Sequence, residues 1–131
     1  SSLCESRVMA NTITIAAQVT LTHTTGLSIP ILPPQNLNFT QAGEGQAGGI
    51  QNIGTSAENI GVGDVATEGY AVFKNLDSTN FVEIGWDSTG FQSAFKLLAG
   101  MVAVVPLNPS RTWQAKADTA AVELFYSILE V

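Results

Sequence analysis

Apolar and polar residues alternate regularly in the first part of the chain. Between Thr12 and Thr22 every second position is apolar, and threonine occupies most of the positions between. A period of two with many β-branched residues is typical of a half-buried β-strand. The next stretch, Gly26 to Pro34, is apolar but contains three prolines. Because proline cannot donate a hydrogen bond to a neighbouring strand, we expect this stretch to be an edge strand or an extended connection.

Glycine dominates the following segment, Gln41 to Gly63. Each glycine inside a helix costs about 1 kcal/mol relative to alanine, so a helix is disfavoured there. We predict short strands and wide loops. The glycines of this segment stand at positions 43, 45, 48, 49, 54, 61 and 63.

The second half of the chain has the pattern of six strands separated by turn-forming residues. Ala99-Gly100 has the composition of a tight hairpin turn, and Asp77 to Asn80 that of a loop closed by an aspartate side chain. Two segments, 57–63 and 93–99, are long enough for a short helix but lack a cap and a complete apolar stripe. The predicted strands are Tyr70–Leu76, Asn80–Trp86, Phe91–Leu98, Met101–Val105, Thr112–Lys116 and Val122–Leu129.

These elements predict an all-β fold, either a β-sandwich or a jelly-roll-like arrangement. The length of 131 residues suits one compact domain. We therefore expect a single β domain over residues 12–131. Residues 1–11, which precede the first alternating strand, are predicted to form an extended N-terminal arm.

The composition argues for protein partners and against charged polymers. Only 12% of the residues are charged, about half the usual share. Such a neutral surface is common where a protein faces other subunits. The net charge is −6, and no lysine or arginine occurs between Arg7 and Lys74. Binding to nucleic acid or to an anionic membrane is therefore not expected.

The cysteine content and the first residues indicate the cellular compartment in which the protein is made. Cys4 is the only cysteine, so no disulfide can form within the chain. The first residues lack the basic and apolar regions of a signal peptide, and no apolar run is long enough to span a membrane. We expect a soluble protein of cytosolic origin.

Several residues resemble known catalytic or binding motifs, but their context favours a structural role. Residues Gly43 to Gly48 match the G-x-G-x-x-G dinucleotide fingerprint, but no helix follows them. His23 is the only histidine, so with Cys4 it cannot supply a usual zinc site, and no nucleophile elbow accompanies it.

Glu83 and Asp87 flank Trp86, a combination that would suit sugar binding or glycoside hydrolysis. The alternation instead predicts that Glu83 faces solvent and that Asp87 begins a turn. We predict no catalytic, cofactor-binding or metal-binding residues and no enzyme activity. Among the aromatic residues, Trp113 is the one we expect at an interface.

Parts of the second half are similar to small structural proteins of tailed-bacteriophage virions. Two segments carry most of the similarity: KNLDSTNFVEIG, residues 74–85, and AKADTAAVELFYSILE, residues 115–130. The resemblance covers roughly residues 57–131, and it implies a β-sandwich or jelly-roll body. Family members include capsid cement or decoration proteins and tail-associated components, so the resemblance leaves head and tail both open. Shorter similar stretches are Ala57-Glu58, Gly69 to Phe73 and Leu97 to Gly100.

The resemblance implies a virion structural protein, and we expect a cement or decoration protein bound to the major capsid protein on the capsid surface. Ser1 to Asn11 and Gly26 to Gly54 are the expected attachment segments. A homo-oligomer, with a trimer as the first expectation, would let weak contacts act together. The alternative is a tail or baseplate component, or a module that binds a receptor or sugar. A small glycan hydrolase is a third reading, which requires two close carboxylates in a cleft.

Overall fold

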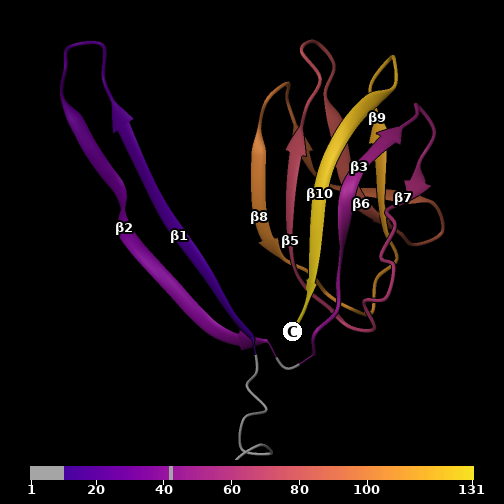
Figure 1. Ribbon diagram of the computed structural model, residues 1–131. Coiled ribbons are helices and arrows are strands. Elements are labelled where there is room, and N and C mark those ends of the chain that lie inside the picture. Colours follow the sequence, from indigo (N-terminus) through magenta and orange to yellow (C-terminus); the bar gives the residue numbers. More distant parts are fainter. Residues whose placement is uncertain (1–10, 42) are drawn as a thin grey trace, which may run out of the picture. The chain divides into compact units, whose positions relative to one another are not determined.

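The computed structural model describes residues 11–41 and 43–131, and all regular elements in them are β-strands (Figure 1). The all-β fold class is therefore as predicted. The chain divides near residue 42 into two compact units, whereas the sequence predicted one domain over residues 12–131. The first two strands form a two-stranded sheet of their own, and the other eight form two four-stranded sheets. The predicted arm, apart from Asn11, lies outside the described residues.

The first unit is an antiparallel hairpin of β1 (Asn11–Thr22) and β2 (Ser28–Gln41). The predicted strand at residues 12–22 is thus confirmed. The turn is closed by the backbone N–H of His23, which donates to the carbonyl of Leu27 at 2.7 Å. Gly26 lies in this turn with a φ of 93°, a conformation that favours glycine. The proline-rich stretch belongs to β2, where the outer edge of a two-stranded sheet tolerates residues without an N–H group.

Two register shifts in the hairpin keep its apolar side chains on one face. Pro33 and Pro34 stand opposite the single residue Gln18, and Ile31 is an extra residue between the next two pairs. Each shift adds one residue to β2 relative to β1, as in a β-bulge. As a result the irregularly spaced apolar residues of β2 meet the evenly spaced apolar residues of β1. The apolar cross-strand pairs are Ile13 with Phe39, Ile15 with Leu37, Val19 with Leu32 and Leu21 with Ile29.

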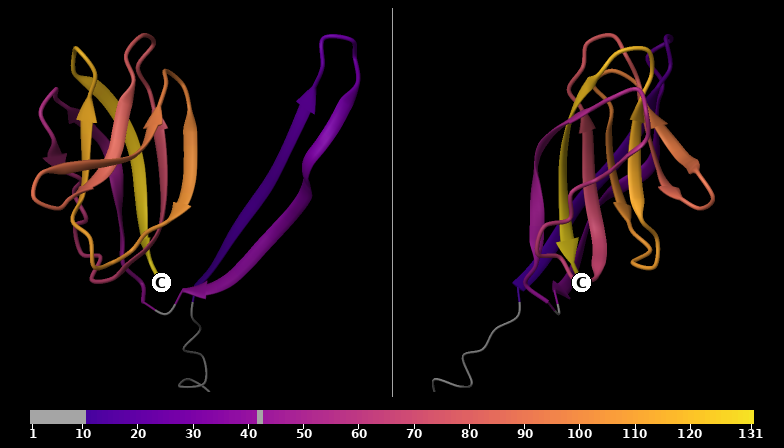
Figure 2. Two further views of the ribbon diagram at one scale, coloured as in Figure 1. Left: turned by 180° about the vertical axis from the view of Figure 1, so that it is seen from behind. Right: turned by 90° about the vertical axis from the view of Figure 1, so that its right-hand side faces the viewer.

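The second unit is a β-sandwich whose two sheets lie face to face, as the edge-on view in Figure 2 shows. One sheet has the order β3-β10-β5-β8 and the other the order β4-β9-β6-β7. The six strands predicted in the second half are all present, and the helices considered at residues 57–63 and 93–99 are not formed. The bounds are β3 Gln46–Ile53, β4 Glu58–Asn59, β5 Glu68–Asn75, β6 Val82–Asp87, β7 Phe91–Leu97, β8 Val102–Pro106, β9 Trp113–Ala117 and β10 Val122–Glu130.

Strand pairing in the sandwich is nested. The first strand pairs with the last, β3 with β10, and β4 pairs with β9. Inside these, β5 pairs with β8 and β6 with β7, and all the pairs are antiparallel. Residues 46–130 are therefore arranged as one long antiparallel hairpin that is folded over. Its successive strand pairs alternate between the two sheets. The pairs of β10 with β5 and of β9 with β6 complete each sheet.

The core lies between the two sheets and follows the strand alternation. In β10, Leu124, Tyr126 and Ile128 are buried, while Phe125 between them is exposed. Phe73 of β5 and Ile84 of β6 are completely buried. The rings of Phe73 and Phe95 lie 6.3 Å apart across the core. Burial of such side chains supplies most of the free energy that stabilises a fold of this kind.

The side chain of Asn75 is a polar group buried in this core, with an exposed fraction of 0%. Its Nδ2 donates to the carbonyls of Asn80 at 2.9 Å and Leu97 at 3.0 Å. Its Oδ1 accepts the backbone N–H of Asp77 at 2.8 Å. In addition, its backbone N–H and C=O bond to Met101 and Gly100. One residue thus holds both the β5–β6 and the β7–β8 connections, which cross between the sheets.

The predicted aspartate-closed loop at residues 77–80 is confirmed. The Asp77 carboxylate accepts the backbone N–H of Asn80 at 2.6 Å and that of Thr79 at 2.9 Å. These two bonds, that of Asn80 first, hold the pKa of Asp77 below its ordinary value. The carboxylate therefore keeps its charge, and these two bonds, at a lower pH than an ordinary aspartate would.

The hairpin predicted at Ala99-Gly100 is wrong. The turn is present, since the N–H of Met101 donates to the carbonyl of Leu98 at 3.0 Å. However, β7 and β8 belong to different sheets. Gly100 has a φ of 80° while Ala99 has a negative φ, as in a type II turn. Such a turn does not match the twist of a paired hairpin, so it suits strands that separate.

Asn75→Ala should lower the free energy of unfolding by about 2–4 kcal/mol, because it leaves three backbone groups without their partner in the core. Urea denaturation of the full chain measures this as a lower midpoint at an unchanged slope.

The control is Asn52→Ala, which deletes the 2.9 Å hydrogen bond from Asn52 to the Glu123 carboxylate on the exposed surface. This change should cost no more than about 0.5 kcal/mol. Equal effects of the two substitutions would contradict the role assigned to Asn75.

Candidate functional site

The glycine motif at residues 43–48 packs against a carboxylate of the same chain. The backbone N–H of Gly45 donates to Oε1 of Glu130 at 2.9 Å. A Cβ at Gly43 would lie 2.5 Å from Cδ of Glu130, and one at Gly48 would lie 2.5 Å from the carbonyl oxygen of Tyr126. The motif leads into β3 and no helix follows it. The glycines therefore permit close approach to β10, and the helix N-terminus of a dinucleotide site is missing here.

The other reactive residues weighed in the sequence do not form a cluster. His23 lies exposed in the hairpin turn, and Cys4 lies outside the described residues. Over residues 11–41 and 43–131, no group of three or more histidine, cysteine, aspartate or glutamate residues could hold a metal ion.

The Glu83, Trp86 and Asp87 combination is not assembled into one site. Glu83 lies between the fully buried residues Val82 and Ile84, so its side chain points to the opposite, outer face. Asp87 accepts the N–H of Gly90 at 3.1 Å and begins a turn, as predicted. Trp86 instead joins Trp113, which lies directly opposite it on β9.

The two tryptophans and Arg111 form an aromatic cluster at one end of the sandwich. The rings of Trp86 and Trp113 meet edge to face with centroids 6.0 Å apart. The Arg111 guanidinium lies 5.0 Å from the centroid of Trp86, within the range of a cation–π interaction. The indole N–H of Trp113 donates to the carbonyl of Asn108 at 3.0 Å, which fixes the ring.

A hollow of about 190 Å³ opens beside this cluster. Its polar groups are one carboxylate, one guanidinium, an amide and a hydroxyl, and Trp113 supplies an aromatic wall. A ligand with hydroxyl groups and an apolar ring face would find both kinds of contact there. The lining residues are Asn59, Ile60, Val62, Glu68, Arg111, Thr112 and Trp113.

A second candidate surface is the outer face of the sheet β3-β10-β5-β8. Ile50, Phe125, Lys74 and Val102 lie in one row across its four strands, because each is directly opposite the next. Ile50 is 61% exposed, Val102 55%, Val104 44% and Phe125 38%. Lys74 is the only charged residue in this row. Exposed apolar surface that continues over several strands marks an interaction site.

The outer face of the other sheet is different. Lys96, Glu83 and Lys116 lie in one row across β7, β6 and β9. Opposite charges on neighbouring strands are typical of a face in contact with water. The outer face of the sheet β3-β10-β5-β8 is the more apolar of the two, although Lys74 and Glu123 also lie on it, and it is the one that suits contact with another protein.

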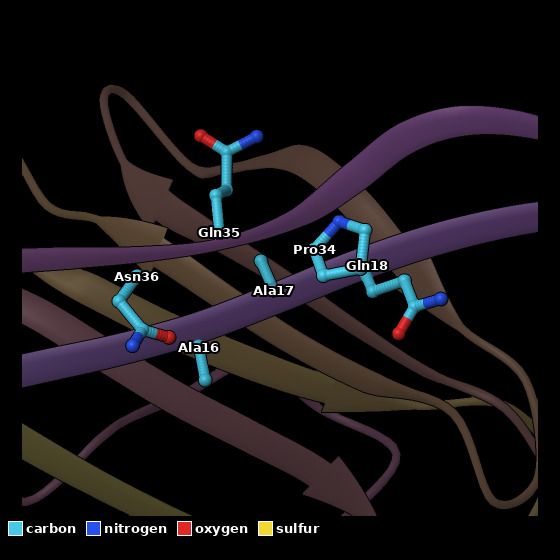
Figure 3. A pocket seen from close by; sticks show the side chains of 6 residues that line it. All are labelled: Ala16, Ala17, Gln18, Pro34, Gln35 and Asn36. Carbon is cyan, nitrogen blue, oxygen red and sulfur yellow. The ribbon is translucent and has the colours of Figure 1, made fainter.

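The hairpin carries a third surface of interest. A hollow of about 200 Å³ lies beside the small residues Ala16 and Ala17, next to Pro34. Figure 3 shows the side chains that line it. The hollow lies at the first register shift of the hairpin, where Gln18 faces the two prolines. The remaining residues that line it are Gln35 and Asn36. Because small and amide side chains line it, this hollow can receive a side chain of a partner, but it offers no catalytic group.

No helix within the described residues is long and apolar enough to cross a membrane. Comparison with known proteins identifies no relative: no family model, no curated protein and no solved structure matches this chain.

Sequence reasoning missed most of these surfaces. It singled out Trp113, next to the turn that contains Arg111, but it brought neither Trp86 nor Glu68 to this place. The apolar outer face could have been noticed from β8, where Val102, Ala103, Val104 and Val105 form an uninterrupted apolar run. A strand with one face in water would instead alternate.

Gly43→Ala and Glu130→Ala should each lower the free energy of unfolding by about 1–2 kcal/mol. Each disturbs the same contact between the glycine loop and the carboxylate. The double variant should therefore lose clearly less than the sum of the two, as measured by urea denaturation.

Gly54→Ala is the control, since a Cβ there would be 3.4 Å from its nearest neighbour, Oε2 of Glu58. It should leave the midpoint nearly unchanged. Strict additivity of Gly43→Ala and Glu130→Ala would contradict a shared contact.

Proposed function

We propose that this protein is a bacteriophage virion structural protein that acts as a cement or decoration protein on the capsid surface. The observation that carries the proposal is the apolar outer face of the sheet β3-β10-β5-β8, with Ile50, Phe125, Val102 and Val104 exposed. In this proposal the face packs against the assembled major capsid protein. In this proposal the protein acts by adhesion to the capsid, and it carries out no catalytic step.

The topology of the sandwich supports this proposal. Nested pairing of eight strands in two sheets is the arrangement of a jelly roll, and we propose that the sandwich is one. Jelly rolls occur in viral capsid proteins and in lectins. The fold alone does not determine function, so this likeness supports a virion role as an analogy. The segment that resembles phage virion proteins, roughly residues 57–131, spans β4 to β10 and hence most of the sandwich.

The physical mechanism follows from mass action. A protein that binds assembled subunits better than dissociated ones stabilises the assembled shell. Apolar burial supplies affinity, and the low charge of the binding face avoids the cost of removing water from charged groups. Attachment through residues 1–11 and 26–54 remains a prediction, and the proposed face adds β5, β8 and β10 to it.

Val104→Glu should weaken binding to phage heads that lack this protein by at least about tenfold, because a carboxylate would be buried against apolar surface. Cosedimentation of the purified chain with such heads over a concentration series measures the affinity.

Ser93→Glu is the matched control, since it adds the same charge at an exposed position of β7, in the other sheet. It should bind as the unmodified chain does. If the unmodified chain does not bind heads, the virion role on the capsid is contradicted. Equal loss of binding in both variants would contradict the assignment of the face.

We propose sugar binding, at the hollow beside Trp113, as the alternative function. The specific observation is that an aromatic wall occurs together with Glu68, Arg111 and Asn59 around one hollow. In this alternative the protein is a tail or baseplate component, or a module that recognises a receptor.

Titration with bacterial surface oligosaccharides should then change the tryptophan fluorescence, and Glu68→Gln should weaken the change at least about tenfold. Glu123→Gln, on the exposed end of β10, is the control and should leave it intact. Absence of any change at millimolar sugar would count against this alternative.

A further inference from the structure

The hairpin presents an apolar face that its own two strands cannot cover. Its cross-strand pairs place aliphatic side chains side by side from Ile13 to Leu21. Along this face Val19 is 50% exposed, Leu37 49% and Leu21 47%. The opposite face is polar, with a 2.7 Å hydrogen bond from Thr14 to Asn38 as an example. The hairpin is thus amphipathic over its whole length.

A two-stranded sheet of this kind needs further support. An isolated hairpin is at best marginally stable in water, and three or more strands or a packing partner are needed for independent stability. In the described part of the chain, β1 and β2 form a sheet of two strands only. A partner for the apolar face would supply the missing burial.

The distribution of charge favours an uncharged, apolar partner for this face. Residues 11–41 contain no aspartate, glutamate, lysine or arginine, whereas residues 43–131 contain all but two of the charged residues and carry the net charge of −6. A partner recognised by charge would have nothing to pair with on the hairpin. An identical hairpin, in contrast, matches it in chemistry, and no charged group loses water when the two meet.

We propose that the hairpin is a self-association element, in which the apolar faces of hairpins from different copies of this chain pack together. The inference rests on residues 11–41 alone and is independent of whether the sandwich binds a capsid. It assigns the oligomer expected from the composition to a particular segment.

The apolar face of one hairpin is smaller than a standard protein interface. Twelve residues of strand extend about 40 Å and two strands with their side chains are about 10 Å wide, so the face has a flat area of about 400 Å². A standard stable interface buries about 800 Å² per partner. The apolar face supplies about half of this area, whether it packs on one hairpin or is shared between two, so contacts at the strand edges have to supply the rest.

The edges of the hairpin are compatible with this arrangement. Natural edge strands are often protected by charged residues or proline. β2 carries Pro30, Pro33 and Pro34, but β1 contains neither proline nor a charged residue. The free edge of β1 can therefore add backbone hydrogen bonds to a neighbouring hairpin once the faces have met.

The test compares the mass of the full chain with that of two lysine variants by sedimentation velocity, from about 1 to about 100 µM. Leu21→Lys with Leu37→Lys places two charges on the apolar face. Thr12→Lys with Thr20→Lys places the same two charges on the polar face. The unmodified chain and the polar-face variant should form the same oligomer, and the apolar-face variant should dissociate at least about a hundredfold more readily.

Near-ultraviolet circular dichroism of Trp86 and Trp113 checks that the sandwich is intact in each variant. If the lysine pair unfolds the chain, Leu21→Ser with Leu37→Ser replaces it and should shift the equilibrium in the same direction. A monomeric unmodified chain at about 100 µM would overturn the proposal. Such a result would indicate that the apolar face is covered within one copy. An apolar-face variant with the unmodified mass would overturn it as well.

Discussion

The sandwich depends on the buried amide of Asn75. Six connections of the sandwich cross from one sheet to the other, and Asn75 bonds to the backbone of two of them, β5–β6 and β7–β8. A buried amide is stable only when its partners are in place, so its hydrogen bonds select one arrangement of the two crossings. The apolar core supplies the larger share of the free energy, but it is less directional.

Once the crossings are in place, strand alternation determines what each outer face presents. The sheet that contains Glu83, Lys96 and Lys116 shows alternating charges to the outside. The sheet with Ile50, Phe125 and Val102 shows apolar side chains. We therefore expect the sandwich to act through a partner that binds the outer face of the sheet β3-β10-β5-β8. The hairpin also presents an apolar face, and residues 11–41 contain no charged residue.

The candidate sites consist of ordinary residues whose importance comes from position. The glycine motif at residues 43–48 has the spacing of a phosphate-binding loop, yet its partner is Glu130, 85 residues from Gly45 in the chain. Similarly, Trp86 stands in the sequence next to Asp87, but it packs on Trp113 from another strand. Motif spacing describes local backbone, whereas these contacts are made by residues that only the sheets bring together.

The sequence by itself determined the all-β fold class, the strands of the second half, the strand at residues 12–22 and the loop closed by Asp77. These features depend on alternation and on turn residues, which act over a few positions. Only the tertiary structure decided that residues 11–41 form a separate hairpin, that β3 pairs with β10, and that the Ala99-Gly100 turn separates its strands into two sheets. The physical reason is that strand pairing depends on burial shared between distant segments, and a turn of suitable composition can serve a paired or a separating connection.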